Sequence, residues 1–114
     1  MTDRELRGMV DKGLAMLPTV EGPPDFGKAF APLDADNLRA WGDCVSADPG
    51  YAASRLFPDV APNLAQNAVY AIMRWSALKA KALEERFYYR TDEALVLEAD
   101  CKNIRLSLPI WARW

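Results

Sequence analysis

The sequence predicts a mainly α-helical protein, a single domain over residues 1–114 with about four helices, one of them long and central. Two observations predict this fold class. Apolar residues recur every three to four positions along most of the chain, which is the period of an amphipathic helix. Residues 63–90 contain neither Gly nor Pro, so they can form one uninterrupted helix. A chain of 114 residues is also long enough to bury a core of its own.

The first helix is expected to begin after Thr2, because Thr2 and Glu5 have the spacing of a capping box. The apolar residues that follow keep a helical period: Leu6, Met9, Val10, Gly13, Leu14 and Leu17. Pro18 ends this helix, since proline cannot donate a backbone hydrogen bond. Gly and Pro then recur through residues 18–33, which predicts a long loop.

This loop contains "GPPDFGKA", residues 22–29, which fits the phosphate-binding pattern G-x-x-x-x-G-K-[ST] except at its last position. Two of its residues are prolines without N–H donors, and Ala29 stands where the magnesium-binding hydroxyl belongs. No strand pattern precedes it. We therefore expect no nucleotide or other cofactor here, and interpret the stretch as a turn whose Phe26 and Phe30 pack on the core.

A second, short helix is expected after Asp34, whose carboxylate is a good N-cap. Its residues Leu38, Trp41 and Val45 lie on one face, and "DPG" at residues 48–50 is expected to end it. The chain from there to the long helix is expected to be a connector.

The long helix is expected to begin at Pro62, because the first helical turn tolerates proline. At 100° per residue, seven residues gather on its core face: Val69, Ile72, Met73, Ser76, Ala80, Leu83 and Phe87. Ser76 and Ala80 are small, so another helix can approach closely there.

Residues 91–108 allow two interpretations. Thr91 and the two acidic residues after it are typical of a helix start, and apolar residues keep a helical period up to Pro109. Alternatively, "ALVLE" and "NIRLSL" could form a short C-terminal β-hairpin. We favour the helix, because two strands without a third are marginally stable.

Composition argues against an enzyme. The chain has no histidine, which excludes Ser–His and Cys–His nucleophile pairs and His-ligated metal sites. Adjacent carboxylates such as Glu84 and Glu85 project about 100° apart on a helix and cannot flank one bond. Cys44 and Cys101 are interpreted as small core residues. We expect no catalytic residue, metal or cofactor; an enzyme that uses carboxylates alone remains a minor alternative.

The net charge is −2 and is unevenly divided. Residues 1–66 contain six Lys or Arg against ten Asp or Glu, whereas residues 67–114 contain eight against six. The chain has no signal-peptide pattern and no apolar run of about 18 residues, which predicts a cytoplasmic protein without a membrane segment.

The long helix carries two stripes that mix aromatic and cationic side chains. One contains Trp75, Lys79, Arg86 and Arg90, and the other contains Tyr70, Arg74, Lys81 and Tyr88. Such stripes are typical of protein-interaction hot spots and of surfaces that bind bases and phosphates. They are equally typical of helices whose aromatic rings and alkyl stems pack along the edge of a core. The negative net charge and the lack of a Lys/Arg cluster disfavour nucleic acid.

The C-terminal stretch "PIWARW" is unusually apolar for a terminus and must either dock on the core or contact a partner. We expect Trp111 to be buried, because Leu108 and Ile110 continue the apolar face. Trp114 has no chain after it to cover it, so we expect it to be exposed and available to a partner or to a second copy in a homodimer.

The expected function is therefore non-enzymatic: binding of another macromolecule, foremost a protein, as an adaptor or inhibitor. Phages and mobile elements encode many domains of this size and composition, and this analogy suggests a similar origin for the chain. The alternative from another class is a nucleic-acid-binding accessory protein that uses the basic and aromatic stripes of the long helix.

Overall fold

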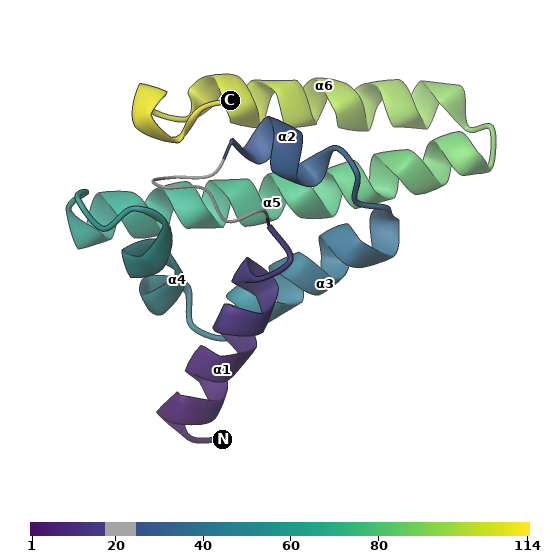
Figure 1. The fold of residues 1–114 in the computed structure, drawn as a ribbon. Helices are drawn as coiled ribbons and strands as arrows, with labels where there is room; N and C mark the ends of the chain where they lie inside the picture. Colours follow the sequence, from purple (N-terminus) through teal and green to yellow (C-terminus); the bar gives the residue numbers. More distant parts are fainter. Residues whose placement is uncertain (18–24) are drawn as a thin grey trace.

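The computed structural model describes residues 1–17 and 25–114, and its fold is mainly α-helical (Figure 1). The helices of the described residues are α1 Asp3–Leu14, α2 Phe26–Phe30, α3 Ala35–Val45, α4 Pro49–Leu56, α5 Pro62–Phe87, α6 Thr91–Ser107 and the short 3-10 helix η1 Ile110–Ala112. The predicted fold class and the long central helix are confirmed. The helical interpretation of residues 91–108 is also confirmed, since the described part of the chain contains no strand.

The long helix α5 is the centre of the molecule. It packs against α6 on one side and against α3 and α4 on the other, and α1 packs mainly on α3 (Figure 1). α5 and α6 form an antiparallel hairpin whose turn lies at one end of the molecule. The C-terminal turn η1 lies toward the opposite end (Figure 1).

The small residues on the core face of α5 have the role that the sequence predicts. Ser76 and Ala80 are fully buried. The Ser76 hydroxyl donates a hydrogen bond of 2.7 Å to the backbone carbonyl of Leu38 in α3. Because no larger side chain intervenes, α3 lies directly against α5, with Trp41 buried in the core.

The prediction of a loop over residues 18–33 is wrong for part of its length. Residues 25–30 begin with Asp25, which caps α2 by accepting a hydrogen bond from the Lys28 N–H. Phe26 and Phe30 are buried, which confirms that they pack on the core. A helix of five residues has little stability of its own, so aromatic packing holds it in place. Residues 18–24 of the predicted loop lie outside the described residues.

The connector predicted after residue 50 is also wrong, because it contains α4. α3 ends at Val45, before the "DPG" stretch, and that stretch starts α4: the Asp48 carboxylate accepts from the Tyr51 N–H, and Pro49 occupies the first turn. These are helix start signals that also fit a turn. The Tyr51 hydroxyl then donates to Asp11 of α1 at 2.7 Å, which joins α4 to α1.

The two cysteines are free. Cys101 is buried between α6 and α5, as predicted, and this burial raises the pKa of its thiol. Cys44 is only partly buried, against α1. Among the described residues, no helix is both long and apolar enough to cross a membrane.

Candidate docking surface

Three consecutive aromatic residues at the turn between α5 and α6 point into solvent. Phe87, Tyr88 and Tyr89, which we call the aromatic corner, are 75%, 62% and 91% exposed. The Phe87 and Tyr88 rings meet edge to face with centroids 5.2 Å apart, and the Arg90 guanidinium lies 5.5 Å from the Tyr88 ring centroid. The corner is therefore a surface of large rings with a cation at its edge.

The backbone of the corner explains why these side chains project. The Arg90 N–H donates to the Glu85 carbonyl, and the Tyr89 N–H donates to the Arg86 carbonyl. This pair of hydrogen bonds is the Schellman motif that ends many helices, and it places Tyr89 in the left-handed conformation with φ of 60°. Glycine is the usual residue there, because a side chain in this conformation costs about 1–2 kcal/mol.

A groove lies beside the corner, between the start of α3 and the last two turns of α5. Its volume is about 680 Å³, and its walls include Leu33, Leu83, Phe87 and Tyr88. The prediction that Phe87 belongs to the core face is wrong. Phe87 does follow Leu83 at helical spacing, but only the first residues of α3 reach this turn of α5, so one side of the ring is left uncovered.

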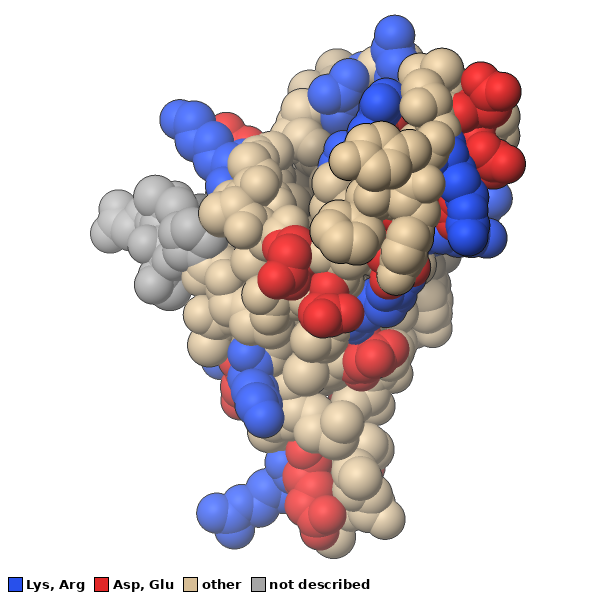
Figure 2. All heavy atoms as spheres, turned by 90° about the vertical axis from the view of Figure 1, so that its right-hand side faces the viewer, with Lys and Arg blue, Asp and Glu red and all other residues tan. Residues whose placement is uncertain are grey.

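The groove is acidic at the α3 end. The Asp34 carboxylate caps α3 by accepting from the Asn37 N–H at 2.8 Å, and Asp36 is exposed in the first turn. Glu84 is hydrogen bonded to Arg39, which lowers the pKa of Glu84. Figure 2 looks at this end of the molecule, where acidic side chains gather below an uncharged projection.

The structure separates the first predicted stripe into parts with different roles. Trp75 is partly buried, and its ring centroid lies 5.2 Å from that of Phe30. Arg86 donates to both oxygens of Glu98 in α6, at 2.5 and 2.8 Å, which lowers the pKa of that carboxyl. Arg90 pairs with Glu85 at 3.3 Å. Lys79 is partly buried on the same helix. Trp75 thus extends the core, while two cations brace the α5–α6 hairpin.

The second predicted stripe remains on the surface. Tyr70 is 49% exposed and accepts a hydrogen bond from Gln66 at 3.1 Å. Arg74 and Lys81 are exposed and form no ion pair within residues 1–17 and 25–114. Lys81 lines a second hollow between α5 and α6, whereas Tyr88 of this stripe belongs to the aromatic corner.

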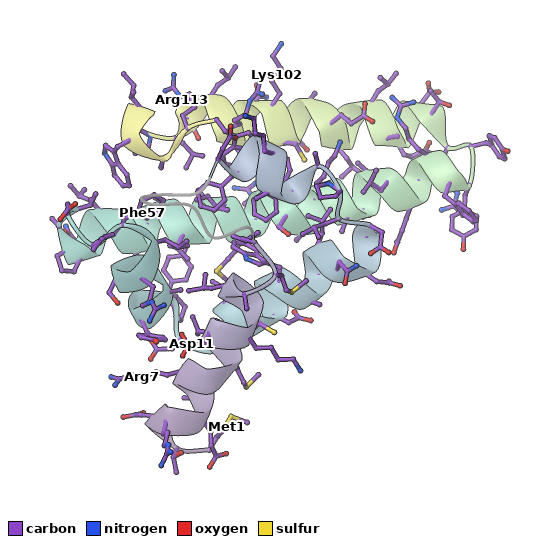
Figure 3. The ribbon with its side chains drawn as sticks, viewed as in Figure 1. Met1, Arg7, Asp11, Phe57, Lys102 and Arg113 are labelled. Carbon is purple, nitrogen blue, oxygen red and sulfur yellow. The ribbon has the colours of Figure 1, made fainter. Side chains whose placement is uncertain are left out.

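The expectation for the two C-terminal tryptophans is reversed. Trp114 packs on the core, with its ring centroid 5.5 Å from Phe26 and 5.1 Å from Trp75. Trp111 is 39% exposed, and its ring centroid lies 5.1 Å from that of Phe57, the side chain labelled in Figure 3. The cause is a reversal of the chain at η1, which the Arg113 guanidinium closes by donating twice to the Leu108 carbonyl.

Sequence reasoning missed the corner as a unit, although it placed Tyr88 in a stripe. The available signal was "FYYR" directly before the helix start at Thr91. A second helix that begins so soon after the first leaves a tight turn at residues 88–90, and a tight turn exposes its side chains.

Comparison with known proteins finds no family model, no curated protein and no solved structure that matches the chain. Within the described residues, no group of three or more Cys, Asp or Glu side chains is arranged to hold a metal ion.

Proposed function

We propose that the protein is a non-enzymatic binding protein, a cytoplasmic adaptor or inhibitor, which contacts a protein partner through the aromatic corner. The observation that carries the proposal is Tyr89: a large, 91% exposed ring at a position where glycine would avoid the backbone strain. The Tyr89 side chain costs stability and is little buried in the monomer. Contact with a partner would explain why it stands at this position.

The chemistry of the corner favours a protein as that partner. Tyr and other aromatic residues are enriched among interface hot spots, and they bind best beside a recess that a partner side chain can fill. Phe87 and Tyr88 form one wall of such a recess. Arg90, which is paired with Glu85, lies at the rim beside the Tyr88 ring. The two free cysteines suit a reducing compartment such as the cytoplasm.

The proposal is tested by quantitative capture from the native host with the wild-type protein and with Phe87→Ser. Because Phe87 is 75% exposed, this substitution should leave folding intact. We expect at least one protein to be captured by the wild type and reduced about tenfold or more with Phe87→Ser, as for loss of a hot-spot residue.

Ile110→Ser is the matched control, since Ile110 is 86% exposed and lies in η1, beyond the C-terminal end of α6. It should capture the same protein as the wild type. Equal capture by all three proteins would contradict the proposal, and so would an equal loss with the two variants.

A further inference from the structure

We infer that the groove between α3 and α5 binds a short basic segment of a protein, in which an apolar side chain is flanked by Lys or Arg. This inference rests on the proposed function and names the kind of partner that the corner takes. It follows from three properties of the groove: its size, its apolar wall and its charge.

The size and the wall suit side chains of a peptide. A volume of about 680 Å³ lies within the range of sites that enclose small ligands, although this groove is open along its length. Leu33 and Leu83 are partly buried beneath it, and the exposed ring of Phe87 stands beside them. An apolar side chain inserted here would remove water from the Phe87 ring and from both leucines.

The charge selects a basic segment. The groove is lined by three carboxylates, Asp34, Asp36 and Glu84, and by no Lys or Arg among the described residues. Glu84 is already paired with Arg39, whereas Asp34 and Asp36 take part in no ion pair in the described chain. The N-terminus of α3 offsets part of this negative charge. The remaining charge attracts Lys and Arg and repels acidic segments and nucleic-acid backbones.

The test is selection from a library of random short peptides against the immobilised wild-type protein, followed by fluorescence anisotropy with the selected peptides. We expect the selected sequences to be enriched in Lys or Arg on either side of a Leu, Phe or Trp. Raising the salt concentration should weaken their binding, because exposed charges are screened. Phe87→Ser should weaken it about tenfold or more.

Asp34→Asn with Asp36→Asn isolates the contribution of charge. Asn caps a helix about as well as Asp, so the start of α3 is preserved. The double variant should weaken binding of the selected peptides about three- to tenfold. Asp43→Asn with Asp59→Asn removes the same charge from exposed positions outside the groove and should leave binding unchanged.

Two results would overturn the inference. The first is that the selected peptides are not enriched in Lys or Arg and bind the Asp34/Asp36 and the Asp43/Asp59 variants with equal affinity. The second is that no selected peptide binds the Phe87→Ser variant more weakly than the wild type. Neither result decides the proposed function, because capture of a whole protein by the wild type but not by Phe87→Ser would still support the aromatic corner as a docking surface.

Discussion

Replacing Trp114 with Ala is expected to lower the free energy of unfolding by about 3 kcal/mol, the lower end of the range for large aromatic residues because the ring is only partly buried. The ring packs against Phe26, Phe30 and Trp75, whose centroids lie 5.5, 6.1 and 5.1 Å away. Its removal would open a cavity where α2, α5 and the C-terminal turn meet.

Trp111→Ala is the matched comparison, since it removes the same side chain three residues earlier. Trp111 is 39% exposed and touches mainly Phe57, so we expect a loss of about 1 kcal/mol. Urea denaturation followed by circular dichroism measures both values. Equal losses, or a larger loss for Trp111→Ala, would show that the C-terminal turn packs differently from the arrangement described.

The second large effect concerns the contact between α1 and α3. A Cβ atom added at Gly13 would lie 2.7 Å from the Cβ of Cys44, which is too close for either helix to keep its position. Gly13→Ala is therefore expected to destabilise the protein by about 1–3 kcal/mol, despite the higher helix propensity of Ala.

Gly8→Ala on the same helix should have the opposite sign. A Cβ atom added at Gly8 meets nothing within 4 Å, so only the gain in helix propensity remains, about 0.5–1 kcal/mol. The two variants are compared by thermal melting. A Gly13→Ala protein that melts at or above the wild-type temperature would contradict the close approach of α1 to α3.

The parts of the fold that could be predicted are those with local signals. The Thr2 hydroxyl caps α1 by accepting from the Glu5 N–H and donates to the Glu5 carboxylate, and α5 and α6 begin at Pro62 and Thr91. The short helix α2 has no such signal beyond Asp25, because its stability comes from contacts with residues distant in sequence. Periodicity therefore predicted α1, α3, α5 and α6 and missed the two shortest α-helices, α2 and α4.

The candidate site was harder to predict, because exposure depends on where neighbouring helices stop. Phe87 keeps the period of the core face, and only the position of α3 shows that it is uncovered. The reversed exposure of Trp111 and Trp114 has the same origin, since the turn at η1 decides which ring reaches α2.

The most direct test of the aromatic corner is capture of the partner by a Tyr89→Gly protein. Glycine removes the strain at φ of 60° but loses more backbone entropy on folding, so the variant should be more stable than the wild type by a net of about 0.5–1 kcal/mol. If Tyr89 serves binding, the same variant should capture about tenfold less partner although it folds better. Capture equal to that of the wild type would contradict the account.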